Sequence, residues 1–126
     1  MNLTLKILSS TFAVCQLPRE SDIPSWATKG ALSSITKTNN ELSVVCEQEL
    51  IPEGVKADKD WRALMVQGPL DFSLVGILAN LSSILASAGV SIFAISTYDT
   101  DYLLVKEESL EKAIEALSAS GHTVLQ

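Results

Sequence analysis

Residues 61–125, WRALMVQGPLDFSLVGILANLSSILASAGVSIFAISTYDTDYLLVKEESLEKAIEALSASGHTVL, carry the pattern that decides the fold. Strand-like runs rich in β-branched and aromatic residues alternate with segments whose apolar residues recur at helical spacing. The expected elements, in chain order, are a strand at 61–67, a helix from Asp71 or Ser73 to about Ala88, strands at 91–97 and 102–105, a helix that Ser109 caps and Gly121 ends, and a strand at 122–125.

The order strand, helix, strand, strand, helix, strand is that of the ferredoxin-like fold. It predicts an α+β domain in residues 61–126, with a four-stranded antiparallel sheet and two helices on one of its faces. The second helix supports this, because Leu110, Ala113 and Leu117 form an apolar stripe while charged residues lie between them.

A long uncharged stretch runs from Asp71 to Asp99 and is long enough to suggest a membrane span. Its apolar residues form one helical stripe, serines and an asparagine lie opposite, and Gly89 can end the helix. We therefore expect an amphipathic helix followed by a buried strand, and no membrane association. The small, uncharged outer face of this helix leaves two interpretations open: cover by the first half of the chain, or a dimer contact.

The first half reads as strands. Asn39-Asn40 is a hairpin signal, residues 22–26 suggest a short helical turn, and residues 52–59 resemble a linker. We expect residues 1–60 to form a separate, mostly stranded unit. Its expected strands are 3–8, 12–17, 31–37 and 41–46.

Composition narrows the class of function. Hydrophobic residues make up 47% of the 126 residues, which is ample for a core, and the net charge is −6 with only nine basic residues. Nucleic acid and anionic membranes are bound by clustered lysine and arginine, so both are disfavoured as partners. An apolar run before Cys15 faintly resembles a lipoprotein signal, but its alternation fits a strand better.

Residues with catalytic or metal-binding chemistry are sparse. Cys15 and Cys46 stand in apolar runs and are expected to be reduced core thiols of a cytoplasmic protein, with a disulfide or metal pair as the alternative. His122, the single histidine, has no second ligand or triad partner and is expected to be a partly exposed strand residue. We expect no enzyme, no metal and no cofactor. A carboxylate-based enzyme using Asp99 and Asp101 is the least favoured alternative.

The segment Ser96-Thr97-Tyr98-Asp99-Thr100-Asp101 places hydroxyls and carboxylates between two strands. Aspartate and threonine are ordinary turn residues, because their side chains bond their own backbone. The same groups could hold an ammonium ion. The residues alone leave both interpretations open.

Four segments together resemble a known family. These are the strand beginning WRALMVQG, the turn GPLDFSLVGIL, the segment STYDTD, and, in the first half, SWATKGALSSITKTNNELSVVCEQELIP. They are similar to small bacterial proteins of the ACT-domain superfamily, in the group related to the eukaryotic cytosolic arginine sensors. The resemblance implies two ACT-like halves in tandem, the first degenerate, and a homodimeric, allosteric regulatory module that binds an amino acid.

The resemblance also implies where that ligand binds. The turn into the first helix would present backbone amides to the ligand carboxylate, and the STYDTD segment would face its amino group and side chain. Asp101 would be the best carboxylate for the ammonium, with Asp99 second. The implied residues are Asp71, Ser73, Leu74, Val75, Gly76, Ile77, Thr97, Tyr98, Asp99 and Asp101.

One position departs from the pattern of the arginine sensors. Their turn has an acidic residue shortly before the glycine, where this chain has Leu74-Val75-Gly76. A leucine does not pair with a guanidinium, so the resemblance leaves open arginine or a smaller, more apolar amino acid. A protein-interaction adaptor without ligand binding is the second function that we consider.

Overall fold

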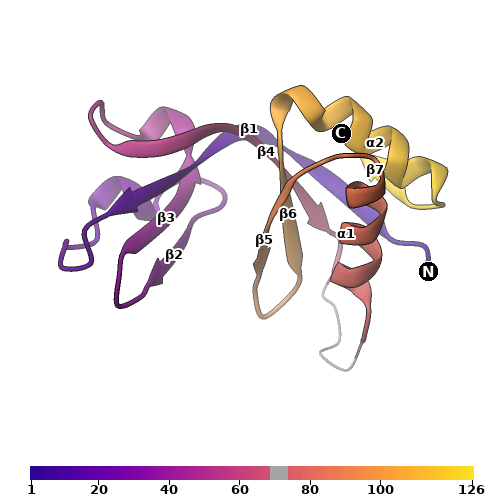
Figure 1. Cartoon of the computed structure of the whole chain (residues 1–126), viewed down its shortest axis with the longest axis horizontal. Helices are drawn as coiled ribbons and strands as arrows, with labels where there is room; N and C mark the ends of the chain where they lie inside the picture. Colours follow the sequence, from indigo (N-terminus) through magenta and orange to yellow (C-terminus); the bar gives the residue numbers. More distant parts are fainter. Residues whose placement is uncertain (69–73) are drawn as a thin grey trace. The chain divides into compact units, whose positions relative to one another are not determined.

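The computed structural model describes residues 1–68 and 74–126 (Figure 1). The α+β fold expected from the sequence is confirmed, with both α-helices in the second half of the chain. The elements are β1 (Thr4–Leu17), η1 (Ser25–Thr28), β2 (Ser34–Lys37), β3 (Leu42–Glu47), η2 (Gln48–Leu50), β4 (Lys56–Val66), α1 (Ile77–Ser87), β5 (Ile92–Ser96), β6 (Asp101–Lys106), η3 (Glu107–Ser109), α2 (Leu110–Ala119) and β7 (Thr123–Leu125).

The chain divides into two compact units. Unit 1 comprises Met1–Ser9 and Arg62–Gln126, and unit 2 comprises Ser10–Trp61. The expected boundary after residue 60 stays a prediction, but the chain begins in unit 1 and returns to it. Strands β1 and β4 therefore each contribute residues to both units.

Unit 1 contains the sheet expected for the ferredoxin-like order, plus one strand from the start of the chain. The first residues of β1 pair in parallel with β7, and the Gln67 amide donates to the Thr4 carbonyl (2.8 Å). β6 and then β5 follow β4 in the strand order. The expectation of a purely antiparallel sheet made within 61–126 was thus wrong, because β1 lies between β7 and β4.

Both helices of unit 1 cover the same face of this sheet. Alternate residues of β1 and β4, such as Leu5 and Leu64, pack with Leu81 of α1 and Leu117 of α2 in one buried cluster. The apolar stripes seen in the sequence are therefore the core-facing stripes. β5 lies at the end of the strand order and has only Ile95 buried, so the expectation of a buried strand was wrong.

Unit 2 consists of strands and short 3₁₀ turns. β2 and β3 form the antiparallel hairpin expected around Asn39-Asn40, closed by the Thr38 amide donating to the Glu41 carbonyl (2.9 Å), and β3 pairs with β1. The expected strands 3–8 and 12–17 are one continuous strand, and the expected linker already contains the start of β4.

Cys15 and Cys46 lie in the core of unit 2, as expected, and both are free and buried. They come from paired strands, since Cys15 stands opposite Val44 and Cys46 opposite Ala13. The two thiols share a hydrogen bond. Burial raises the pKa of both, that of Cys46 to about 12, so the thiols stay protonated and unreactive at neutral pH.

His122 differs from expectation. It is buried rather than partly exposed, and it precedes β7 at the end of α2, where its amide donates to the Leu117 carbonyl (3.1 Å).

Neither of the helices within the described ranges has the length and apolar character that a membrane span requires.

Candidate functional site

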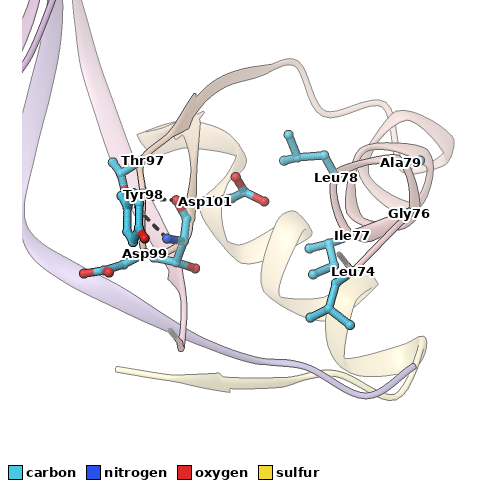
Figure 2. A pocket seen from close by; sticks show the side chains of 10 residues that line it. Leu74, Gly76, Ile77, Leu78, Ala79, Thr97, Tyr98, Asp99 and Asp101 are labelled. Atoms are coloured by element: carbon cyan, nitrogen blue, oxygen red, sulfur yellow. Dashed lines mark hydrogen bonds between the residues drawn. The ribbon is translucent and has the colours of Figure 1, made fainter. Parts of the chain in front are cut away.

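A pocket of about 290 Å³ lies in unit 1 between the start of α1 and the turn that joins β5 to β6 (Figure 2). Two segments that are distant in the sequence, residues 74–79 and 97–101, form its described walls. The volume approaches the lower limit of typical small-molecule sites. The lining residues are Leu74, Gly76, Ile77, Leu78, Ala79, Thr97, Tyr98, Asp99, Thr100 and Asp101.

The β5–β6 turn is held by its two threonines. The Thr97 amide and hydroxyl both donate to the Thr100 carbonyl (2.8 and 3.1 Å), and the Thr100 amide donates back to the Thr97 hydroxyl (3.3 Å). The buried Thr100 hydroxyl donates to the carbonyl of Val66 in β4 (2.5 Å). These threonines therefore serve the turn itself, as turn chemistry predicts.

The two carboxylates of this segment are not used in the same way. Asp101 stands at the start of β6, opposite Ser96, whose hydroxyl donates to Oδ1 of Asp101 (2.5 Å). In Figure 2 the Asp101 carboxylate points toward the first turn of α1, whereas Asp99 points the other way. The Tyr98 side chain is 81% exposed at the tip of the turn. Asp101 is thus the carboxylate that faces the helix.

The opposite wall is the N-terminus of α1. The helix begins at Ile77, after Gly76 in the left-handed conformation (φ 82°), and its first bond runs from the Asn80 amide to the Gly76 carbonyl (2.8 Å). The expected cap at Asp71 or Ser73 was therefore wrong. The amides of the first turn have no partner within a helix, and with the helix dipole they favour an anion.

The structure brings seven of the ten predicted residues together around the pocket: Leu74, Gly76, Ile77, Thr97, Tyr98, Asp99 and Asp101. Val75 is 84% exposed and does not line it. Asp71 and Ser73 lie outside the described residues. The sequence analysis missed Leu78, Ala79 and Thr100. Leu78 and Ala79 line the pocket because α1 begins later than predicted. Thr100 belongs to the STYDTD segment but was not chosen as a ligand residue.

This arrangement can hold a zwitterion. The Asp101 carboxylate faces the first turn of α1 (Figure 2), and Leu74, Ile77 and Leu78 add apolar side chains to the lining. None of its described lining residues is basic. Within residues 1–68 and 74–126 no group of three acidic, histidine or cysteine side chains could hold a metal ion.

Comparison with known proteins relates the chain to others. The sequence pattern of the ACT domain matches residues 56–119, and that of a separate N-terminal domain matches residues 10–54. Subunit 1 of the human cytosolic arginine sensor for mTORC1 is 40% identical over 58 residues, which is 45% of this chain and 18% of the sensor. The chain thus spans about a fifth of the length of such curated relatives.

Two solved structures show how far the fold is shared. A crystal structure of a protein from Agrobacterium tumefaciens has 39% identity and a TM-score of 0.94, and the match covers 99% of this chain and 93% of that one. The regulatory subunit of aspartate kinase from Thermus thermophilus has 13% identity and a TM-score of 0.63, with 91% and 95% covered. At that identity, the likeness shows the fold alone.

Proposed function

The chain belongs to the ACT-domain family, and on this premise we propose that it is a non-enzymatic regulatory module that binds an α-amino acid in the pocket at the start of α1. We propose further that it acts in the cytoplasm without a cofactor. Binding would shift the packing of the unit, or of a partner, rather than drive chemistry. A relative named as an arginine sensor supports an amino acid as the ligand class.

One observation carries the proposal: the Asp101 carboxylate faces the N-terminal turn of α1 across the pocket. An α-amino acid presents an ammonium and a carboxylate a few bonds apart. The ammonium would donate to Asp101, and the carboxylate would accept from the first-turn amides of α1. The bond from Ser96 occupies one oxygen of Asp101 and fixes its orientation.

The walls of the pocket favour an aliphatic side chain. The arginine sensors that the sequence resembles have an acidic residue shortly before the glycine of this turn, whereas here the apolar Leu74 precedes Gly76 and lines the pocket, as does Leu78. Asp99, the other carboxylate of the pocket, is directed away from α1 (Figure 2). We therefore propose leucine, valine or a similar amino acid as the ligand, ahead of arginine.

The test is a thermal-shift panel of the twenty amino acids on the wild-type chain. A ligand at a hundred times its dissociation constant adds about 2.7 kcal/mol, which corresponds to several degrees in Tm. We expect aliphatic amino acids to stabilise and arginine to have the smaller effect.

Asp101→Asn is the informative variant, because asparagine keeps an acceptor for Ser96 but loses the charge. We expect roughly ten- to hundredfold weaker binding. Glu115→Gln, an equal charge change on the exposed face of α2, is the matched control and should bind as wild type. No response to any amino acid would contradict the proposal, and so would equal binding by both variants.

We also propose that two copies associate as a homodimer. Val75, next to the pocket, and Tyr98, in its lining, are both more than four-fifths exposed, and a partner that packs on them would cover these apolar side chains. Sedimentation at several protein concentrations tests this. If the chain associates but no amino acid binds, an interaction adaptor becomes the better account of the same surface.

A further inference from the structure

The buried histidine of unit 1 connects three segments, two through its ring and one through its backbone amide. The amide of Leu3, just before β1, donates to His122 Nδ1 (3.0 Å), and His122 Nε2 lies 2.8 Å from Oδ1 of Asn80 in α1. Its backbone amide joins it to the end of α2. Only 5% of His122 is exposed, so the histidine is buried and its two ring bonds are partly shielded from water.

These partners fix the protonation state of the ring. An amide N–H can only donate, so Nδ1 of His122 must carry a lone pair toward Leu3. The hydrogen of the neutral ring then sits on Nε2 and is donated to the Asn80 carbonyl oxygen. A second proton would go onto Nδ1 and point at the Leu3 amide, which would break that bond and place two donors face to face.

Asn80 connects this ring to the candidate ligand site. It is the fourth residue of α1, and its amide makes the first bond of the helix to the Gly76 carbonyl (2.8 Å). Its side chain is held by His122 at the same time. The three residues before it, Ile77, Leu78 and Ala79, form the start of α1 and line the pocket.

The surroundings oppose a charge on the ring. Its hydrogen-bond partners among the described residues are Leu3 just before β1, Asn80 of α1 and Leu117 of α2, and none of them carries a charge. Burial is the main cause that lowers the pKa of His122, and the positive charge of the Met1 amino group lowers it further.

We propose that neutral His122 is a positioning residue for the ligand pocket: through Asn80 it holds the first turn of α1 in the binding geometry, and protonation of His122 releases that turn. The amino-acid site would then lose affinity in acid. The part that concerns affinity rests on the proposed function, whereas the part that concerns the helix can be tested without any ligand.

The first experiment reads the ring directly. Because His122 is the single histidine of the chain, its imidazole nitrogens give one resolvable pair of signals in a long-range ¹H–¹⁵N spectrum. We expect the Nε2–H form at pH 7.5 and a midpoint of titration below the ordinary histidine value. A proton on Nδ1 of the neutral ring would overturn the proposal.

The second experiment follows α1 without ligand. Hydrogen-exchange protection of the Asn80 and Leu81 amides, corrected for intrinsic rates, should fall in step with the titration of His122. In His122→Gln, which has a neutral amide in place of the ring, this pH dependence should disappear. In Asn80→Ala the ring should titrate without changing protection, while Ser83→Ala, on the exposed face of α1, should behave as wild type. Protection that ignores the titration in wild type overturns the proposal.

The third experiment measures binding of L-leucine between pH 5 and pH 7.5, where its zwitterion keeps the same charge. Below the midpoint of His122, the apparent dissociation constant should rise by up to about tenfold per pH unit in wild type and stay flat in His122→Gln. Equal slopes in both would overturn the link to affinity. If L-leucine does not bind at any pH, the ligand proposal fails, and the exchange experiment still decides the role of His122.

Discussion

The two units build their hydrophobic cores from different elements. Unit 1 has two amphipathic helices on one face of its sheet, whereas in unit 2, residues 10–61, strands pack with short 3₁₀ turns. Each also buries groups that titrate. His122 in unit 1 charges in acid, and Cys15 and Cys46 in unit 2 charge in alkali. Because of this difference, a change of pH or a local substitution can perturb one unit at a time. The response of the other unit then measures how far its stability depends on the first.

The largest effect is expected from Leu81→Ala in α1. Leu81 is fully buried in the core of unit 1, and such truncations cost about 2–5 kcal/mol. Helices α1 and α2 lie in unit 1 and both tryptophans lie in unit 2, so the helical signal of far-ultraviolet circular dichroism and the tryptophan fluorescence report mainly on different units during urea unfolding.

We expect both signals of Leu81→Ala to shift to lower urea together, because β1 and β4 contribute strands to both units. Ser83→Ala, on the exposed face of the same helix, is the control and should change little. A shift in the helical signal alone would contradict this dependence, since unit 2 would then be stable without unit 1.

A smaller effect is expected from Thr100→Val in the β5–β6 turn. Valine has nearly the shape of threonine but leaves the Val66 carbonyl without the donor that now bonds it. Loss of a bond in a buried site costs about 1–3 kcal/mol. Thr100→Ser keeps the hydroxyl and should retain most of the stability in thermal unfolding. If valine and serine are equal, the bond does not anchor the turn.

The smallest effect is expected from alkali on unit 2. The thiol of Cys46 has its pKa raised to about 12 by burial and then by Cys15, so the unfolded chain loses its proton first. Stability is therefore complete below the ordinary thiol pKa and falls as pH rises from about 9 toward 12, by on the order of 1 kcal/mol at pH 10.

Urea unfolding at pH 8 and pH 10, followed by tryptophan fluorescence, measures this loss. Cys46→Ala should be less stable at both pH values but should show a weaker dependence on pH. Acid has the opposite relation to unit 1. The pKa of His122 is lowered, so its contribution is present above about pH 6.5 and is lost as pH falls toward the folded-state value.

Local pattern predicted most of the elements. Helix α2, the hairpin of β2 and β3, and the burial of the two cysteines were predicted from periodicity, turn residues and apolar context respectively. The failures came from pairing between distant segments. Ser9-Ser10-Thr11 interrupts an apolar run, but β1 continues through it because its neighbours in the sheet supply the hydrogen bonds.

The same limit applies to the candidate site. The segments around Gly76 and Asp101 were predicted to meet, mainly through a family resemblance, and in the structure they line one pocket. The start of α1 was predicted too early, because the prediction relied on residues whose side chains can cap a helix. The helix instead begins after Gly76, a left-handed residue that has no side chain to serve as a cap. His122 could not be predicted to be buried, since its partners Leu3 and Asn80 come from far along the chain.

Unit 2 is inserted into unit 1, and this has a consequence for how the sequence can change in evolution. Unit 2 occupies one unbroken stretch that leaves unit 1 after Ser9 and rejoins it at Arg62, whose side chain donates to the Leu8 carbonyl (3.1 Å). The two points of departure therefore stand side by side on adjacent strands. If unit 2 were removed, a short hairpin turn could join these two strands. Evolution or a designer could therefore delete or replace the whole segment without changing the order of the strands that remain in unit 1.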